Sequence, residues 1–319
     1  MKILVTGANG FVGKWLCEAL VQQGCSLRAG VRSTNSPIEA VETVAVGTID
    51  GQTDWSNALN QIDVVIHLAA RVHVMNDDAV DSLGEYRKVN VEGTLNLAKQ
   101  AVAYGVKRFI FLSSIKVNGE CTELGKPFKE DDIPNPQDNY GLSKYEAEEG
   151  LSLIALKTAM DVVVIRPPLI YGPGVKANFA NMMKVVQRGI PLPFGAIYNK
   201  RSMVYVGNLV SLILRCIDHP AAANQVFLVS DGCDVSTTEL LRACAAALCV
   251  KARLLPMPQS WIESGASLLG KQAIAQRLCG SLQVDITKAK QQLDWSPPFQ
   301  LSEGLKITAL GVSSGLNPK

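Results

Sequence analysis

Hydrophobic residues along the first half of the chain fall into two alternating patterns. Short runs rich in Val, Ile and Leu are separated by longer stretches in which apolar residues recur every three or four positions. The short runs predict buried β-strands, and the longer stretches predict amphipathic helices. We expect strands over 2–7, 26–31, 64–69, 108–113 and 161–167, and helices over 12–22 and 85–103.

The regular alternation of strand and helix determines the expected fold class. Such a chain forms a parallel sheet with helices on both faces, the doubly wound α/β fold. After residue 165 Pro and Gly become frequent, and we expect only one more strand, 226–230, and one more helix, 236–248. The sequence therefore predicts a main domain over 1–165, completed by parts of 200–230, and a smaller C-terminal region over 166–319 that covers the ligand crevice.

Composition narrows the class of partners. The 319 residues are 47% hydrophobic and 19% charged, and the formal net charge is +2. A nearly neutral chain without a Lys/Arg-rich block gives no sign of nucleic-acid binding. No apolar segment approaches the ~18 to 20 residues of a membrane span, and the eight cysteines form neither CxxC nor a metal-like cluster with histidine. These features are typical of a cytoplasmic enzyme that binds no metal.

The first expected strand ends in a glycine-rich loop that leads into a helix. Gly7, Gly10 and Gly13 form the pattern GxxGxxG. The first glycine permits a tight turn, the second lets backbone N–H groups approach a pyrophosphate, and the third lets helix and strand pack closely. The helix N-terminus adds partial positive charge at the phosphates. We therefore predict an NAD(P)-binding Rossmann domain, with Gly7, Gly10, Phe11, Val12 and Gly13 at the cofactor.

The end of the second expected strand bears on the choice of cofactor. In NAD enzymes an Asp or Glu about 20 residues past the glycines accepts the ribose 2′-hydroxyls. Val31 and Arg32 stand there instead, followed by Ser33 and Thr34. An arginine pairs well with a 2′-phosphate through a charge-assisted hydrogen bond. We predict NADP as the cofactor, contacted by Arg32, with NAD as the alternative.

Tyr140 and Lys144 form a YxxxK pattern at the start of a further expected helix. A spacing of four puts both side chains on one helical face. Free tyrosine has a pKa near ~10, but a nearby ammonium together with an oxidised nicotinamide lowers that pKa and makes the phenol a usable acid and base. Ser114 follows the strand 108–113, at the sheet edge where open α/β folds bind ligands. We expect Tyr140 and Ser114 to contact the same substrate oxygen.

These motifs together resemble one family. The glycine pattern, HLAA, VNVEGT, SSIKVNG, YGLSK and RPPLIYGPG occur in the order found in extended short-chain dehydrogenases, and 284–297 resembles the closing segment of the NAD-dependent epimerase/dehydratase family. The resemblance implies Ser114, Tyr140 and Lys144 as the catalytic triad, with Lys144 also binding the nicotinamide ribose. It further implies cofactor contacts from Ile49, Leu68, Ala69, Ala70 and Asn90. At Thr48 the chain departs from an Asp that relatives commonly place near the adenine.

The same resemblance points to a sugar carried on a nucleotide diphosphate, with UDP-sugars as the expected substrates. Asn178 matches an asparagine that relatives use on the diphosphate, and Arg201 matches their pyrophosphate-binding arginine, a suitable partner for two phosphates. Dehydratases of the family carry an Asp–Glu pair where this chain has Ile115 and Lys116. Without that pair, elimination of water is not expected.

Two reactions at C4 of the sugar remain, and one non-catalytic alternative. Lys116 and Asn118 depart from the residues common in 4-epimerases. The chain resembles reductases that use NADPH on the C4 ketone of a UDP-linked 4-keto-6-deoxy (2-acetamido) sugar for bacterial surface polysaccharides, and we predict that activity first. The alternative is a UDP-glucose or UDP-N-acetylglucosamine 4-epimerase with retained NAD. Non-catalytic NADP sensors of this fold typically lose the Tyr or the Lys, which this chain keeps.

The oligomeric state can also be anticipated from the resemblance. Relatives pair the helices that correspond to 85–103 and 144–156 across a two-fold axis. Both stretches carry many charges on their outer positions in this sequence. A homodimer through these helices is therefore an expectation to be tested.

Overall fold

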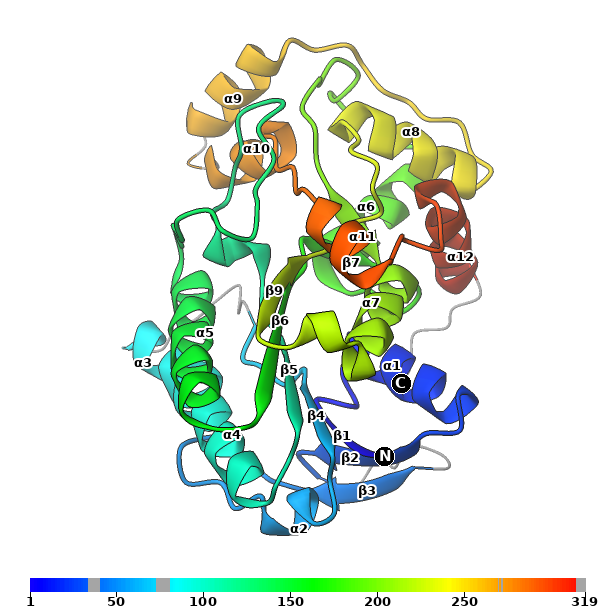
Figure 1. The fold of residues 1–319 in the computed structure, drawn as a ribbon. Helices are drawn as coiled ribbons and strands as arrows, with labels where there is room; N and C mark the ends of the chain where they lie inside the picture. Colours follow the sequence, from blue (N-terminus) through cyan, green and yellow to red (C-terminus); the bar gives the residue numbers. More distant parts are fainter. Residues whose placement is uncertain (34–40, 73–80, 269, 271, 314–319) are drawn as a thin grey trace.

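The centre of the computed structural model, which describes residues 1–33, 41–72, 81–268, 270 and 272–313, is a seven-stranded parallel sheet in the order β3-β2-β1-β4-β5-β6-β9 (Figure 1). Every pair of neighbouring strands is parallel, as the predicted doubly wound fold requires. Its strands are β1 (Lys2–Thr6), β2 (Ser26–Val31), β3 (Glu42–Ala45), β4 (Val64–His67), β5 (Arg108–Leu112), β6 (Asp161–Arg166) and β9 (Gln225–Leu228).

The strand order reverses between β1 and β4. From β1 the chain moves outward to β2 and β3, and it then returns to pair β4 with the other side of β1. Ile3 is consequently paired with Leu27 on one side and with Val64 on the other. Loops that leave the carboxyl ends of β1 and β4 run in opposite directions, which opens the crevice where doubly wound folds bind their ligands.

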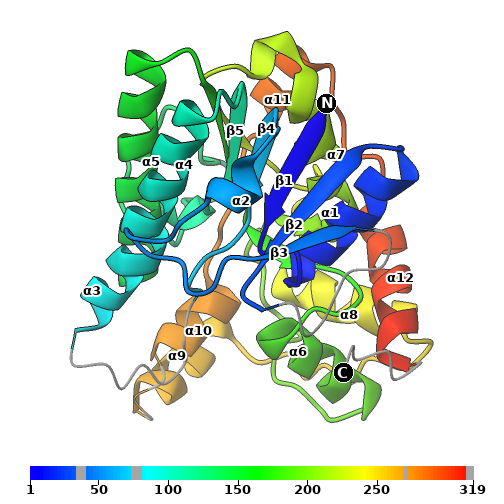
Figure 2. The same cartoon turned by 90° about the horizontal axis from the view of Figure 1, so that it is seen from below.

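Helices cover both faces of this sheet (Figures 1 and 2). On one face α1 and α7 enclose a core that includes Leu16, Leu20 and Leu209, and on the other α4 and α5 enclose a core that includes Leu97 and Leu151. The helical segments of this part are α1 (Phe11–Gln22), α2 (Ser56–Leu59), α3 (Ser82–Tyr86), η1 (Arg87–Gly93), α4 (Thr94–Ala103), η2 (Ile115–Val117), α5 (Asn139–Lys157), α7 (Val206–Asp218) and η3 (Pro220–Ala222).

The later part of the chain adds a small second layer beyond the carboxyl ends of the strands. It contains a two-stranded parallel sheet, β7 (Leu169–Tyr171) with β8 (Met203–Tyr205), and in Figure 1 its helices α8, α9 and α10 lie at the end of the molecule away from the N-terminus. The helices of this part are α6 (Ala177–Gln187), α8 (Thr237–Ala247), α9 (Gln259–Leu268), α10 (Gln272–Cys279), α11 (Thr287–Leu293) and α12 (Leu301–Ser313).

Two hydrophobic runs of the later part end up in different layers. The expected strand 226–230 corresponds to β9, which pairs with β6 and so extends the main sheet. The expected helix 236–248 corresponds to α8, which begins with a capping box in which the Ser236 hydroxyl and Glu239 carboxylate satisfy each other's backbone N–H groups. No helix in the described part of the chain is long and apolar enough to cross a membrane.

The helix expected over 85–103 differs from the simple amphipathic pattern. Residues 82–103 are helical, but the middle seven, η1, have the wider π geometry. A π turn adds one residue to the helical repeat, which moves the side chains on either side out of register with a 3.6-residue pattern. The strands β3, β7 and β8 were not expected, because β3 is half-exposed and β7 and β8 have only three residues each.

Candidate active site

The glycine loop between β1 and α1 is shaped by close backbone contacts. Gly7 has a φ of +68°, and a Cβ there would lie 2.8 Å from the backbone nitrogen of Ala69. A Cβ on Gly13 would lie 2.2 Å from the Gly7 carbonyl oxygen. The Gly10 N–H donates to that same carbonyl at 2.8 Å. Gly7 and Gly13 therefore have no room for a side chain, which keeps the loop narrow and its backbone accessible.

Helix α1 begins directly after this loop, and its N-terminus is suited to binding a diphosphate. Gly10 is its N-cap and provides no side-chain hydrogen bond, and the described residues of the first turn include no acid. The first N–H groups of the helix are thus free to meet an anion, with the helix dipole favouring negative charge. Phe11 is partly buried and Val12 is buried, so these two side chains anchor the turn. The residues present fit the phosphates of a dinucleotide.

The loop after β4 is fixed to β1 by a buried chain of hydrogen bonds. Thr6 Oγ1 contacts His67 Nδ1 at 2.7 Å, and His67 Nε2 contacts Thr94 Oγ1 at 3.0 Å. Ala69 N also donates to Thr6 Oγ1 at 3.3 Å. Burial, aided by the charge of Lys144, lowers the pKa of His67 to about 3. The ring is therefore neutral and structural, and it holds the backbone of Leu68, Ala69 and Ala70 beside Gly7.

Ser114 lies just beyond the carboxyl end of β5. The pairing with β6 continues past the strand, since Ser113 N donates to Ile165 O at 2.8 Å and Ile115 N donates to Pro167 O at 3.0 Å. The Ser114 side chain is 9% exposed, and its hydroxyl accepts from Lys116 N at 3.2 Å at the start of η2. The hydroxyl is thus oriented by the turn that follows the strand.

Tyr140 and Lys144 lie one turn apart near the start of α5. Lys144 is 1% exposed, and its ammonium donates to the Leu112 carbonyl at 2.9 Å and lies 4.4 Å from the centre of the Phe111 ring. Both contacts are at the end of β5, immediately before Ser114. The structure therefore brings α5 and the β5 terminus together, as the motif spacing and strand order predicted.

Burial dominates the ionisation of both α5 groups. It raises the pKa of the Tyr140 phenol, with smaller contributions in the same direction from Asp138 and Tyr86. It lowers the pKa of Lys144 to about 7, although the Glu148 carboxylate opposes that change. Each group is therefore poorly stabilised in its charged form by the protein alone. A positively charged group near Tyr140 would favour the phenolate that a base needs.

The π segment η1 places Asn90 against the same helix. Its side chain, 1% exposed, donates to Ser143 Oγ at 3.0 Å and to the Arg71 carbonyl at 3.0 Å, and it accepts from Arg71 N at 2.8 Å. Ser143 Oγ in turn donates to the Tyr140 carbonyl at 2.8 Å. Asn90 thus links the loop after β4 to the first turn of α5, and its expected contact with the cofactor stays a prediction.

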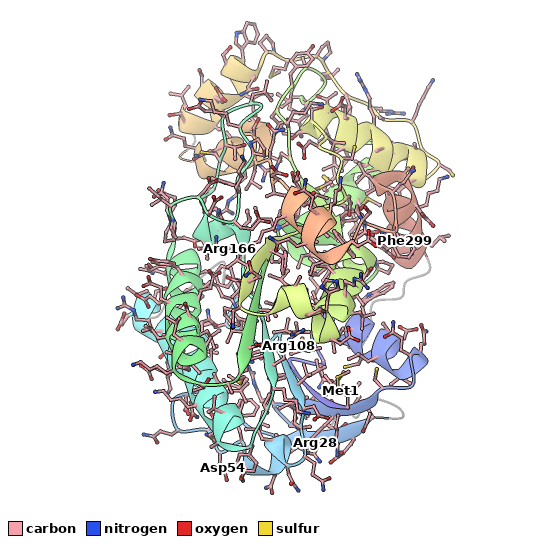
Figure 3. All side chains as sticks on the ribbon, viewed as in Figure 1. Met1, Arg28, Asp54, Arg108, Arg166 and Phe299 are labelled. Atoms are coloured by element: carbon pink, nitrogen blue, oxygen red, sulfur yellow. The ribbon has the colours of Figure 1, made fainter. Side chains whose placement is uncertain are left out.

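A buried ionic network beside these residues was not anticipated. Glu148 receives hydrogen bonds from the Ser113 hydroxyl and from Arg166, whose Nη2 lies 2.6 Å from Glu148 Oε2. Arg166 also donates to Asn118 Oδ1 at 3.0 Å. Figure 3 labels Arg166 at the upper end of β6, next to α5. Glu148 follows Lys144 by four residues, so extending the YxxxK pattern by one turn would have drawn attention to it.

Two expected cofactor contacts occupy the other side of the crevice. Arg32 is the first residue after β2, and its side chain is exposed. Ile49 packs against the end of η1, where a Cβ on Gly93 would lie 2.6 Å from Ile49 Cγ2. Thr48 uses its carbonyl to accept from the Thr53 hydroxyl at 2.8 Å. Residues 34–40, which include Thr34, lie outside the described part of the chain.

Arg201 lies in the later part of the chain, held by three distant segments. Its backbone bonds Val235 in both directions, at 2.9 and 3.1 Å, and its Nη1 donates to the Gly280 carbonyl at 3.0 Å. Burial lowers the pKa of Arg201, and the like charge of Arg277 on α10 lowers it further. The positive charge of Arg277 thus reaches Arg201, and such a positive site suits an anion with several negative oxygens. Periodicity gave no signal for Arg277, because only the fold brings α10 to Arg201.

Not every expected substrate contact can be located. Asn178 belongs to α6, but its side chain lies outside the described residues. The segment that contacts Arg201 is joined to the loop after η2, which follows the end of β5, because Thr122 N donates to Ser281 O at 2.9 Å and Phe128 pairs with Val284.

Among the residues that the structure describes, no group of three or more His, Cys, Asp or Glu side chains could bind a metal ion.

Comparison with known proteins gives a consistent result. The model of the NAD dependent epimerase/dehydratase family matches residues 3–230. A UDP-glucose 4-epimerase of Vibrio cholerae is 52% identical over 309 residues, which cover 96% of this chain and 94% of the relative. A solved UDP-glucose 4-epimerase of Thermotoga maritima, with UDP-glucose, has a TM-score of 0.77 and 26% identity and covers 99% of this chain and 100% of its own. The structure of MoeE5 with UDP-glucuronic acid and NAD has a TM-score of 0.80 at 23% identity, with the same coverage.

Proposed function

The chain belongs to the NAD dependent epimerase/dehydratase family, and on that premise we propose that it is a UDP-sugar 4-epimerase that inverts C4 of a UDP-linked hexose and retains NAD between turnovers. The observation that carries the proposal is that Lys144, one helical turn after Tyr140, reaches the Leu112 carbonyl at the end of β5, just before Ser114, in a chain 52% identical to a UDP-glucose 4-epimerase. This is the alternative among the two C4 reactions expected from the sequence, and the relatives favour it over the reductase.

The chain's own residues have separable tasks in this reaction. Tyr140 accepts the proton of the C4 hydroxyl and later returns it, and Ser114 hydrogen-bonds the same oxygen. Lys144 supplies positive charge on the same helical face and binds the nicotinamide ribose, while Gly7, Gly10 and Gly13 leave space for the diphosphate. When bound, NAD supplies the hydride acceptor and donor. Arg201, with Asn178, binds the diphosphate of the UDP-sugar, which leaves the sugar free to present either face.

The decisive assay uses purified protein without added nucleotide. We expect UDP-glucose or UDP-N-acetylglucosamine to be converted to its C4 epimer with no net change in the absorbance of reduced nicotinamide. We also expect NAD to be released when the protein is denatured, because an enzyme that restores its own cofactor has no need to exchange it. Absence of the epimer, with NAD neither retained nor required, would contradict the proposal.

One observation favours the reductase as a second candidate. Arg32 is exposed directly after β2, and the described residues at that strand end, Val31 to Ser33, offer no carboxylate to a ribose. If Arg32 pairs with a 2′-phosphate, NADPH should bind about tenfold to a hundredfold more tightly than NADH, corresponding to roughly 1.5 to 3 kcal/mol. The double change Val31→Asp and Arg32→Asn should reverse that preference. Stoichiometric NADPH consumption with a UDP-4-keto-6-deoxy sugar would promote this candidate.

We also propose that the protein is a homodimer formed through α4 and α5. Leu153 and Leu156, on the later turns of α5, are 56% and 79% exposed, which leaves apolar surface on the helix expected at the interface. Light scattering at micromolar concentration should give twice the mass of one chain. Replacement of Leu156 by Glu should shift the protein toward monomer, and a monomeric unaltered protein would reject this assembly.

A further inference from the structure

Lys116 lies between the two elements that carry the reactive side chains. Its backbone N–H donates to Ser114 Oγ at 3.2 Å in η2. Its ammonium forms one ion pair with Asp138 and another with Glu120 at 3.0 Å. Asp138 is the N-cap of α5, two residues before Tyr140. A single lysine therefore contacts Ser114 through its backbone and the start of the Tyr140 helix through its side chain.

The two elements are also in direct backbone contact at this point. A Cβ on Gly141 would lie 2.9 Å from the Lys116 carbonyl oxygen and 3.2 Å from Lys116 Cβ. Asp138 uses both carboxylate oxygens, because Oδ1 accepts from Gly141 N at 2.7 Å while Oδ2 accepts from the Lys116 ammonium. The carboxylate thus caps α5 and connects it to η2 at the same time.

The ion pair also affects the electrostatics at Tyr140. After burial, the Asp138 carboxylate is the next largest cause of the raised pKa of Tyr140. The Lys116 ammonium partly offsets that negative charge, and both side chains are only about a quarter exposed, 27% and 26%, so solvent screens the pair incompletely. Loss of the ammonium would leave the carboxylate beside Tyr140 with less compensation.

We propose that Lys116 is a positioning residue for this site, which holds the first turn of α5 against η2 and offsets the charge of the N-cap carboxylate beside Tyr140. The proposal rests on the proposed role of Tyr140 in proton transfer. Lys116 occupies one of the two positions at which dehydratases of the family carry an Asp–Glu pair, and the proposal gives that position a different task. Its consequence is that Lys116 and Asp138 should influence the acid limb of the pH profile in opposite directions.

Other charged and titratable groups surround Tyr140 and must stay constant in the test. Lys144 follows on α5, and Tyr86 on α3 has its ring centre 6.2 Å from that of Tyr140, with the Arg71 guanidinium over the Tyr86 ring. Glu120 lies on the η2 side, and an Arg87–Glu146 ion pair connects η1 with α5. Changes confined to Lys116 and Asp138 leave these side chains themselves unaltered, although Lys116→Met also removes the ion-pair partner of Glu120.

The test compares Lys116→Met, Asp138→Asn and the double variant in the full-length protein with NAD. A tyrosinate base loses activity as the pH falls through its pKa, so a higher pKa moves the acid limb of kcat to higher pH. We expect a shift of roughly half a unit to one unit upward for Lys116→Met and a similar shift downward for Asp138→Asn. The double variant should return most of the way to the profile of the unaltered protein, because only the Glu120 carboxylate is left without its partner, and Lys116→Arg should behave like the unaltered protein. Asn at 138 still caps the helix.

Two further measurements distinguish failure of the proposed function from failure of the positioning role of Lys116. Lys126→Met, which removes an exposed ion pair with Glu123, is the matched control and should leave the profile unchanged. Ultraviolet difference titration of each variant against the same variant carrying Tyr140→Phe reads the phenol directly and needs no sugar. Opposite shifts in that titration without sugar turnover would reject the proposed function and retain the role of Lys116. No shift, or shifts in the same direction accompanied by lost thermal stability, would overturn the positioning role.

Discussion

Lys144 reaches the carbonyl of Leu112, 32 residues away, whereas Arg201 reaches that of Gly280, 79 residues away. The first contact joins the end of β5 to the helix that packs on the same sheet; the hydrophobic run predicts the strand, and the Tyr140–Lys144 spacing predicts the helix. The second joins irregular segments through isolated bridges to Val235 and Leu282. The part of the site proposed to be catalytic is thus fixed by the sheet, and the part proposed to bind the substrate diphosphate is fixed by loop contacts. Changes in the first part should affect chemistry, and changes in the second should affect substrate affinity.

The largest expected effect tests the catalytic part. Tyr140→Phe removes the proton-transfer group and should reduce kcat by about a hundredfold to ten-thousandfold, with the NAD dissociation constant nearly unchanged. Steady-state assays and cofactor titration measure the two quantities. Tyr145→Phe, on the same helix with its hydroxyl on Glu149, is the control and should keep full activity. If Tyr140→Phe is as active as that control, the catalytic assignment is wrong.

A smaller effect is expected in the substrate part. Arg201→Met should raise KM for the UDP-sugar by about tenfold to a hundredfold and leave the NAD dissociation constant unaltered, because charge-assisted hydrogen bonds contribute roughly 1.5 to 3 kcal/mol. Arg242→Met, an exposed position on α8, is the control. A fall in kcat without a rise in KM would show that the two parts are not separable in the way the contacts suggest.

The smallest expected effect concerns the glycine loop, which serves the cofactor. Gly13→Ala introduces a Cβ that would lie 2.2 Å from the Gly7 carbonyl and should lower the free energy of unfolding by about 1 to 3 kcal/mol, together with NAD affinity. Gly51→Ala, where the nearest atoms are at 3.4 Å, is the matched control. Thermal denaturation and calorimetric titration measure both effects. Equal stability of the two variants would mean that the loop relaxes around the methyl group.

The sequence predicted most of the main sheet because its signals are local. Strands such as β4 begin with apolar runs (Val64–Ile66), and the glycine loop and the Tyr140–Lys144 spacing lie within single segments. The choice between the C4 reactions was less accessible, and the relatives favour the alternative rather than the first prediction. The Arg166–Glu148 pair and the effect of Arg277 on Arg201 depend on tertiary contacts between distant segments. The spacing after Lys144 points to Glu148, but no sequence pattern pairs it with Arg166 or places Arg277 near Arg201.

The π segment at Arg87–Gly93 has a consequence for how this chain tolerates insertions and deletions. A π turn is an α-helix with one extra residue, and removing one residue from it would restore the ordinary repeat. An α-helix advances about 100° per residue and the wider π turn less, so the helix before and after such a deletion would keep nearly the same faces. A deletion just after Asn90 would thus leave α4 packed on the sheet and change only the local backbone from which Asn90 reaches Ser143. The extra residue therefore acts locally, at the turn that carries this side chain, and leaves the structural helix in place.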